Sequence, residues 1–322
     1  MDKNSELRLL VKIATLYYDE RLNQSAIARS LNLSQSFVSR AIKRCHNEGL
    51  VKVSVIHPTG TFVALELSLQ QKYGLQQMIV VDIEDNAPAQ AVKRAVGSGA
   101  AAYLQTTLRP DDLVGISAWS TFISAMVEAL HPRMAKARGV IQILGGVGHN
   151  RNLRANILTD DLAHLLDCPA SFLPTTSEVR TPEEKRQRLL DPEIADVVKR
   201  FPNVDLAIVG IGTSEQSDLV RNLGIVYREE TVKMLASHGA VGDICLHYYD
   251  KNGAPILSEE EDPVISISLA QLRNCPRVLA LAGGLEKVAA LKGAMAGGYI
   301  DVLVTDRLTA LALLQEPVTT AA

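Results

Sequence analysis

The chain has few cysteines, and they lie far apart. Cys45, Cys168, Cys245 and Cys275 form no C-x-x-C pair and show no spacing typical of metal ligands. This usage suits a reducing cytoplasm, and we expect each cysteine to be a small core residue rather than a reactive thiol. No metal site and no cofactor is predicted.

Long apolar runs and several familiar motifs are also missing. No apolar run approaches the roughly 20 residues of a membrane helix, and the charged N-terminus is unlike a signal peptide. We therefore expect a cytoplasmic protein without a membrane partner. There is no complete G-x-G-x-x-G, no Walker A lysine motif, no H-E-x-x-H and no G-x-S-x-G. The seven histidines are scattered; for His247, which follows Asp243 closely, a structural role is favoured over a catalytic one.

Positive charge is concentrated at one end of the chain. Residues 1–56 hold nine Lys or Arg and five Asp or Glu, whereas the remainder holds 24 and 31, within a net charge of −3. The slight acidic excess argues against general coating of nucleic acid, and a basic head on an acidic body fits phosphate contact at that end only. At 322 residues, the chain is long enough for one small and one large domain.

Residues 21–44 predict two short helices joined by a tight turn. Asn23 and Ser25 can cap the start of the first helix, and Ser34 can cap the second. Asn32 lies where the chain must reverse, and Asn tolerates a left-handed backbone well. We expect a helix-turn-helix whose buried faces contain Ala26, Ile27, Leu31, Phe37, Val38, Ala41 and Ile42.

The flanking segments extend this pair into a winged DNA-binding domain. Residues 5–20 predict a third helix, and residues 49–56 combine a Gly stop with the alternating β pattern of a wing. Residues 34–47 would enter the major groove, with Arg40 and Gln35 on base edges and the other polar side chains mostly on phosphates. The candidate DNA contacts are Ser34, Gln35, Ser36, Ser39, Arg40, Lys43 and Arg44. The alternative is a helical hairpin with a solvated face.

The remainder of the chain predicts an α/β domain. We expect a DNA-binding domain over 1–56, a linker over 57–65, and an effector-binding and oligomerisation domain over 66–322. Near-continuous apolar runs, typical of strands, lie at 78–82, 112–117, 139–146, 205–212, 264–268, 277–284 and 300–306. Helical patterns lie at 88–108, 121–137, 157–166, 182–200, 228–238, 285–297 and 307–315. Strands buried on both faces and separated by helices indicate a doubly wound parallel sheet.

Small or Gly-rich turns follow four of the predicted strands. They begin at Ser117, Gly145, Gly210 and Gly283. Ligands of open α/β sheets bind beyond the carboxyl ends of strands, where Gly allows close approach and helix N-termini favour anions. Hydroxyl groups are present in these turns at Ser117, Ser120, Thr121 and Thr213. The turns therefore predict a polyhydroxylated or phosphorylated ligand.

Several sequence blocks occur in an order that identifies a family. The N-terminal block is LYYDERLNQSAIARSLNLSQSFVSRAIKRCHNEGLV, and GISAWSTF, ILGGVG, VGIGTS, GAVGDI and LAGGLEKVAALKGAMAGGYIDVLVTD follow. Over essentially its whole length the chain resembles the SorC family of bacterial sugar-responsive transcription regulators, within the DeoR-like group. GAVGD and GG-x-x-K are the more specific blocks. One departure is Ala118-Trp119-Ser120-Thr121, where the family often has Trp-Gly followed by Thr.

The resemblance implies a body fold shared with sugar-phosphate isomerases and CoA transferases. In such relatives a sugar, polyol or sugar phosphate binds at the strand ends and alters binding to double-stranded operator DNA, and the proteins usually assemble as homotetramers. The effector-binding residues that it carries over are Ser117, Ser120, Thr121, Gly145, Gly146, Gly212, Asp243 and Lys287. These types suit such a ligand, because Asp accepts hydrogen bonds from vicinal hydroxyls and Lys supplies a compact positive charge.

Two other functions remain open from the sequence. The body fold also allows a sugar-phosphate isomerase or deaminase with an accessory DNA-binding head. Such catalysis needs a positioned base and a proton relay, and the sequence offers no compact Asp/Glu/His constellation beyond Asp243 and His247. A scaffold whose helix-turn-helix binds protein would not need the basic excess of residues 1–56. A regulator without enzymatic activity is the predicted function.

Overall fold

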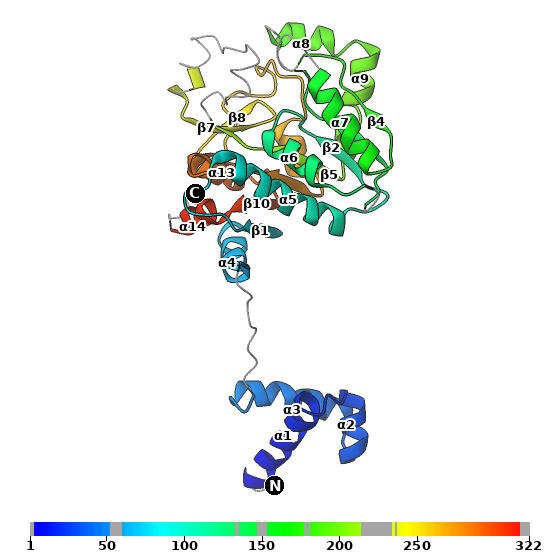
Figure 1. Ribbon diagram of the computed structural model, residues 1–322, viewed down its shortest axis with the longest axis vertical. Helices are drawn as coiled ribbons and strands as arrows, with labels where there is room; N and C mark the ends of the chain where they lie inside the picture. Colours follow the sequence, from blue (N-terminus) through cyan, green and yellow to red (C-terminus); the bar gives the residue numbers. More distant parts are fainter. Residues whose placement is uncertain are drawn as a thin grey trace. The chain divides into compact units, whose positions relative to one another are not determined.

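The structure, a computed structural model, divides the chain into two compact units, Met1–Pro58 and Thr59–Ala322. It describes residues 3–51, 60–132, 135–146, 153–176, 179, 181–213, 234–235 and 237–315. Figure 1 shows the helices and strands of each unit. Each unit has a hydrophobic core of its own.

The described part of the first unit consists of three helices that begin and end at predictable residues. They are α1 (Lys3–Tyr18), α2 (Gln24–Leu31) and α3 (Gln35–Asn47). The side chain of Asn23 accepts a hydrogen bond from the N–H of Ala26 at 2.9 Å, and that of Ser34 accepts one from the N–H of Phe37 at 3.2 Å. Asn32 ends α2 with φ 55° and ψ 44°, the left-handed conformation that reverses the chain. The predicted helix-turn-helix is confirmed.

The three helices pack around a small apolar core. Ile13, Ile27 and Val38, one from each helix, are fully buried. The buried stripe of α3 consists of Val38, Ala41, Ile42 and Cys45. Phe37 lies about 100° round the helix from Val38 and is 38% exposed, so the prediction that it is buried is wrong. Ser25 lies within α2 rather than at its cap. The predicted wing over 49–56 falls mostly on residues outside the described ones.

The second unit is built on a parallel sheet of seven strands in the order β1-β10-β9-β5-β2-β3-β4. The strands are β1 (Gln77–Val81), β2 (Leu113–Ile116), β3 (Gly139–Gln142), β4 (Ala170–Ser171), β5 (Leu206–Gly210), β9 (Val278–Leu281) and β10 (Val302–Asp306). All their pairings are parallel; Ile116 lies opposite Ile208, for example, between β2 and β5. The predicted doubly wound parallel sheet is confirmed.

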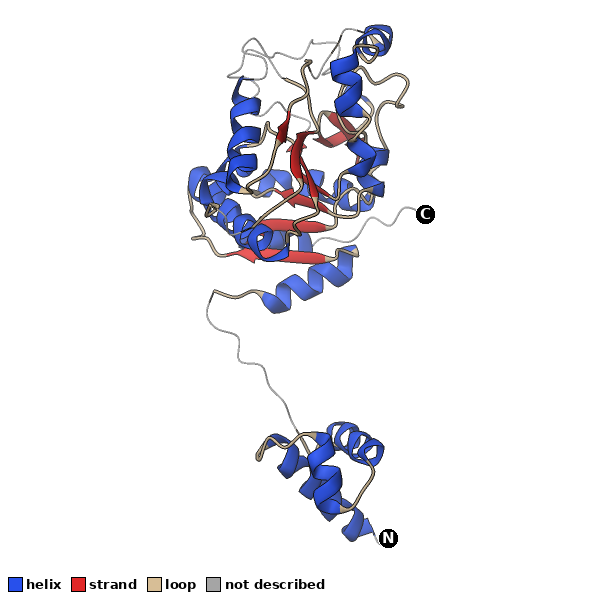
Figure 2. Ribbon diagram, turned by 90° about the vertical axis from the view of Figure 1, so that its right-hand side faces the viewer, coloured by secondary structure: helices blue, strands red, loops and turns tan. Residues whose placement is uncertain are grey.

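Helices lie on both faces of this sheet (Figure 2), because successive strand side chains point to opposite sides. In β5, Leu206 and Ile208 belong to one apolar cluster, and Ala207 and Val209 belong to the other. The first cluster includes side chains of α5 (Ala89–Thr107), α6 (Thr121–Ala129) and α7 (Leu153–Leu165). The second includes side chains of α4 (Val63–Tyr73), α9 (Pro192–Val198), α12 (Leu269–Asn274), α13 (Val288–Ala296) and α14 (Arg307–Gln315). Burial on both faces explains the near-continuous apolar runs.

Two predicted elements of the body are wrong. The sequence predicts a sheet strand over 264–268, but this segment lies outside the seven-stranded sheet, and Ser266 forms an isolated antiparallel bridge with Leu144. An apolar run indicates burial. This segment is largely buried, but it does not pair with any strand of the seven-stranded sheet. The helix expected over 182–200 is two helices, α8 (Pro182–Arg188) and α9, because the Asp191 side chain caps the second and proline at 192 starts it afresh.

A small antiparallel sheet was not predicted. Its order is β6-β7-β8, with strands β6 (Gly212–Thr213), β7 (Ala240–Ile244) and β8 (His247–Asp250). A two-residue turn, Cys245-Leu246, joins β7 to β8, with Ile244 opposite His247. The helix predicted at 228–238 falls mostly outside the described residues, and α6 ends at Ala129, short of the predicted 137.

The four cysteines are free thiols in or against the cores. Cys45 and Cys245 are buried, and Cys168 and Cys275 are half-buried. Burial raises the pKa of each thiol, that of Cys245 to about 12, which keeps them in the poorly nucleophilic protonated form. This agrees with the predicted core role. None of the helices that the structure describes is long and apolar enough to cross a membrane.

Ile13→Ala is expected to destabilise the first unit. Ile13 is fully buried, so its truncation leaves a cavity and costs about 2–5 kcal/mol of the local free energy of unfolding. Hydrogen exchange of the α1–α3 amides in the full chain measures this loss. Val11→Ala on the same helix removes a side chain that is 47% exposed and should change that free energy by less than about 0.5 kcal/mol. Equal protection in the two variants would contradict the described core.

Candidate functional site

The carboxyl ends of β2 and β5 lie where the order of the parallel strands reverses. The chain runs outward from β2 through β3 and β4, then returns to β5 on the other side of β2 and continues toward β1. Ligands of doubly wound folds bind in the crevice outside such a pair of strands. The N–H of Ser117 donates to the carbonyl of Ile208 at 3.0 Å, so the loop after β2 begins directly beside β5. This crevice is the candidate effector site.

The loop after β2 brings three predicted effector residues to the crevice. Ser117 is buried, and its hydroxyl hydrogen-bonds to the thiol of Cys245. Ser120 and Thr121 are half-buried at the start of α6. Gly210 makes room for this loop, because a Cβ on Gly210 would lie 2.7 Å from the Oγ of Ser120. The hydroxyls of the loop therefore lie against the end of β5.

The glycines after β3 shape their loop but use their backbone donors within the protein. The N–H of Gly145 donates to the carbonyl of Ile265 at 3.3 Å, and the N–H of Gly146 donates to that of Thr175 at 2.8 Å. The indole N–H of Trp119 donates to the carbonyl of Gly145 at 3.1 Å, which ties this loop to the one after β2. The two glycines thus line the edge of the sheet without offering these N–H groups to an anion.

The side chain of Asp243 occupies the space that Gly212 leaves open. Gly212 lies opposite Asp243 in the antiparallel pairing of β6 and β7. A Cβ on Gly212 would lie 1.7 Å from the Oδ1 of Asp243, a separation that non-bonded atoms cannot adopt. Gly212 therefore acts through the space that it leaves for the carboxylate.

Asp243 and Lys287 affect each other's ionisation. Burial raises the pKa of Asp243 to about 6, and the N–H of Leu246, then Lys287 and His247, partly oppose this rise. Burial lowers the pKa of Lys287, and the carboxylates of Asp243 and Glu286 partly oppose this fall. Lys287 ends the short helix η2 (Leu285–Lys287), directly before α13. Both charges lie in poorly solvated surroundings, where a polar ligand interacts with them strongly.

The turn after β7 is strained, and Asp243 holds it in place. Cys245 and Leu246 have φ of 54° and 68°, in the left-handed region that side chains other than Asn rarely adopt. Each such residue costs about 1–3 kcal/mol. The N–H of Leu246 donates to the Oδ2 of Asp243 at 3.1 Å. Asp243 therefore both faces the crevice and fixes the hairpin that carries it.

Cys245 and Leu246 shape the site through this turn, and the sequence does not point to them. Two-residue hairpin turns of this geometry usually contain Asn-Gly or a similar pair, and Cys-Leu gives no such signal. Along β8 the residues alternate between buried and half-buried, but the sequence His-Tyr-Tyr-Asp does not show this alternation.

The predicted DNA contacts share one surface of the first unit. Ser34, Gln35, Ser36, Ser39, Arg40, Lys43 and Arg44 are all exposed. Phe37 is exposed among them. The guanidinium of Arg44 is already bound, because it pairs with Glu6 of α1 and, at 2.5 Å, with Glu48. A phosphate would have to compete with two carboxylates for Arg44.

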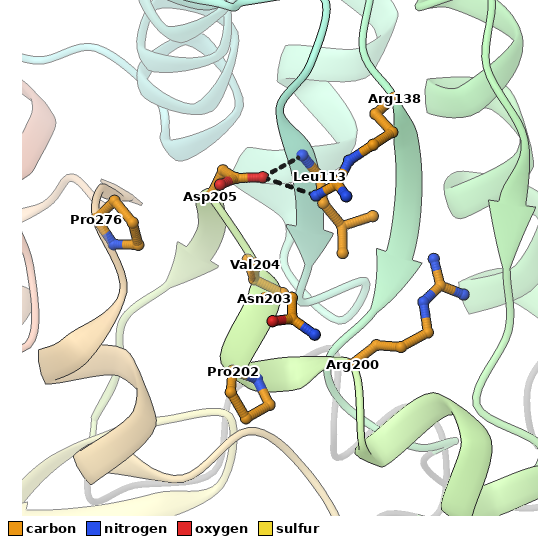
Figure 3. Close-up of a pocket in the computed structure, with 8 residues that line it drawn as sticks. All are labelled: Leu113, Arg138, Arg200, Pro202, Asn203, Val204, Asp205 and Pro276. Atoms are coloured by element: carbon orange, nitrogen blue, oxygen red, sulfur yellow. Dashed lines mark hydrogen bonds and ion pairs between the residues drawn. The ribbon is translucent and has the colours of Figure 1, made fainter.

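A cavity of about 400 Å³ lies at the opposite edge of the sheet (Figure 3). Its lining includes Leu113 at the start of β2, Arg138 just before β3 and Asp205 just before β5, so it faces the amino ends of the strands. Asp205 accepts hydrogen bonds from the N–H of Leu113 at 2.8 Å and from Arg138 at 3.0 Å. The predicted effector residues lie at the other edge, which is where ligands of this fold class bind.

Known proteins match both units of the chain. A family model described as a sugar-binding domain matches residues 57–315, and one described as winged helix-turn-helix DNA-binding matches residues 13–52. The chain is 31% identical over 319 residues to the sorbitol operon regulator of Klebsiella pneumoniae and 30% identical over 317 residues to the deoxyribonucleoside regulator of Bacillus subtilis (strain 168). Each match covers 98% of this chain and 100% of the relative. The crystal structure of full-length SorC from Klebsiella pneumoniae matches with a TM-score of 0.72 at 28% identity, over 97% of this chain and 100% of that one.

Asp243→Asn is expected to flatten the dependence of stability on pH. The pKa of Asp243 in the folded chain, about 6, lies above its ordinary 3.8, so the folded state binds this proton more tightly than the unfolded state. Stability is therefore lost as the pH rises from about 4 to about 6, by up to about 3 kcal/mol. Asn does not titrate, and its amide oxygen can still accept the N–H of Leu246.

Urea unfolding of the two proteins across this pH range tests the prediction. The wild type should lose free energy of unfolding relative to the variant as the pH rises. Parallel pH profiles for the two proteins would show that Asp243 is not held in a desolvated site.

Proposed function

The chain belongs to the SorC family of sugar-responsive transcription regulators, and we propose that its effector binds in the crevice beside Asp243, Lys287 and the loop after β2. The matches to a sugar-binding domain, a DNA-binding helix-turn-helix and two full-length regulators establish the family. The resemblance predicted from the sequence is confirmed, as is the function of a sugar-responsive DNA-binding regulator. We further propose which residues form the two sites and how the chain assembles.

One observation carries the effector site: Asp243 and Lys287, both half-buried and close enough to affect each other's ionisation, lie on the segments that follow β5 and β9 at the edge where the strand order reverses. The carboxylate of Asp243 accepts hydrogen bonds from vicinal hydroxyls, and the ammonium of Lys287 binds a phosphate or a sugar oxygen. Ser120 and Thr121 add hydroxyls at the start of α6, where the helix dipole favours a negative group. This combination suits a sugar, a polyol or a sugar phosphate.

In this proposal α3 reads operator DNA. Arg40 and Gln35 contact base edges in the major groove, and Phe37 offers an apolar contact to a thymine methyl group. The remaining candidates, Ser34, Ser36, Ser39 and Lys43, hold phosphates. Arg44 mainly braces α3 against α1 through Glu6.

We expect the second unit to couple effector binding to operator binding by joining several copies of the DNA-binding unit in one oligomer. We expect a cytoplasmic homo-oligomer, a tetramer by family resemblance, bound to a palindromic or repeated operator without a cofactor. Such an oligomer would hold its DNA-binding units in two alternative arrangements. The effector can change operator affinity only as far as it binds one arrangement more tightly than the other.

Lys287→Met is expected to weaken the stabilisation of the chain by its effector. Thermal unfolding with a panel of sugars, polyols and their phosphates identifies the effector, which at 100 times its Kd stabilises the wild type by about 2.7 kcal/mol. Loss of the ammonium removes one charged anchor and should weaken affinity at least about tenfold. Lys251→Met removes an exposed lysine from the turn after β8 and is the matched control. A compound that stabilises both variants equally binds outside the proposed crevice.

Arg40→Ala is expected to cost about 1–3 kcal/mol of operator affinity and to reduce discrimination against unrelated DNA. Gel-shift titration at fixed salt with the chain's own promoter region and a scrambled duplex measures both quantities. Arg8→Ala removes an exposed arginine of α1 as a control and should leave the discrimination ratio unchanged. Undiminished discrimination by Arg40→Ala would remove Arg40 from the reading surface.

A further inference from the structure

A second pocket of the body lies beside β8, α8, α9 and α12. Its volume is about 590 Å³. Much of its wall is apolar, with Leu189, Leu257 and Leu269 among the lining residues, and the polar side chains of His247 and Ser266 also reach it. Amphipathic pockets with a few converging polar groups are typical of small-molecule sites.

This pocket is lined by the same hairpin that carries Asp243. Ile244 lies opposite His247 in the β7–β8 hairpin, and Asp243 lies opposite Tyr248 one step further along. His247 and Tyr248 both line the pocket, whereas Asp243 is not among its lining residues. The pocket is therefore a neighbour of the effector crevice with a lining of its own.

Ser266, His247 and Asp262 form a hydrogen-bonded chain in the pocket wall. The Nδ1 of His247 lies 2.6 Å from the Oδ2 of Asp262, and its Nε2 lies 2.7 Å from the Oγ of Ser266. His247 and Asp262 are buried, whereas Ser266 is half-buried and lines the pocket. The Oδ1 of Asp262 accepts the N–H of Val264 at 2.9 Å, which fixes the carboxylate. Nucleophile, base and orienting acid are recognised by this geometry, whatever their order in the chain.

The hydrogen bonds allow His247 to act as a base. An ionised Asp262 accepts the Nδ1 proton, which leaves the Nε2 of neutral His247 as an acceptor. The Ser266 hydroxyl has three acceptors in reach, Nε2 at 2.7 Å and the carbonyls of Cys245 at 3.0 Å and Ile267 at 3.5 Å, and the shortest contact is to the imidazole. We propose that Ser266 is an activated nucleophile that takes the acyl group of a small carboxylic ester with an apolar substituent.

Each step of this acyl transfer balances within the residues and water present. The Oγ of Ser266 attacks the ester carbonyl carbon as the Nε2 of His247 takes the hydroxyl proton. The bond from the carbonyl carbon to the alkoxy oxygen then breaks, and His247 returns the proton to the departing alcohol. Water attacks the acyl-serine by the reverse sequence, which releases the carboxylic acid and regenerates Ser266.

Fluorophosphonate labelling of the full chain tests the nucleophile directly. Ser266 would form a bond from Oγ to phosphorus with loss of fluoride, and intact mass followed by peptide mapping locates the adduct. The wild type should gain one probe mass on Ser266, and it should hydrolyse p-nitrophenyl acetate faster than S266A. Asp262→Asn retains the side-chain shape but removes the orienting charge, so labelling should slow about 10²-fold or more.

Ser68→Ala is the matched control, because Ser68 is an exposed serine of α4, outside the pocket lining, that donates its hydroxyl to the carbonyl of Ala64 at 2.8 Å. It should label and hydrolyse ester like the wild type. His247→Gln tests the base, and circular dichroism establishes that each variant is folded. An unlabelled wild type, under conditions that label a serine protease fully, overturns the proposal. So does labelling of Ser266 at an equal rate in folded His247→Gln and Asp262→Asn variants, because the serine would then react without activation.

Discussion

The hydrogen bond from the Leu246 N–H to the Asp243 carboxylate fixes the turn beside the proposed effector site. It holds two consecutive left-handed residues in a turn that contains neither Gly nor Asn. That turn sets the register of β7 against β8, and the gap left by Gly212 allows the same carboxylate to lie against β6. A second bond supports the same turn, because the hydroxyl of Ser266 donates to the carbonyl of Cys245 at 3.0 Å.

The same carboxylate lies in surroundings that disfavour its charge. Burial shifts the pKa of Asp243 upward and that of Lys287 downward, so each group is less stable charged here than in water. A structure selected for stability alone would replace or expose such groups. Their retention at the strand reversal fits a site that gives up folding stability for recognition.

The sequence predicts the helix-turn-helix well because its determinants are local. Asn23, Asn32 and Ser34 act within four residues of their own positions. The predicted burial of Phe37 fails by a single helical position, which is enough to move a side chain from the core to the surface. The parallel strands are likewise predictable from their apolar runs, but residues 264–268 show that an apolar run indicates burial and not strand pairing.

The residue types of the effector site follow from family resemblance, whereas its geometry does not follow from the sequence. The occupied N–H groups of Gly145 and Gly146 depend on carbonyls of distant segments. The chain of Ser266, His247 and Asp262 carries no motif, because it forms only when an extended segment lies beside β8. Such long-range juxtapositions arise from the packing of the whole body.

The ion pairs of Arg44 have a consequence for how tightly one reading head can hold a duplex. Two carboxylates already neutralise this arginine, and Arg40 is assigned to base edges in the proposed complex, so Lys43 is the remaining Lys or Arg of α3 for the phosphates. Counterion release scales with the number of phosphates neutralised, which makes the contribution of one helix small. In the proposed oligomer, avidity supplies the rest: joined heads raise one another's effective concentration at neighbouring half-sites, and a variant that failed to assemble is expected to lose its operator with every base contact intact.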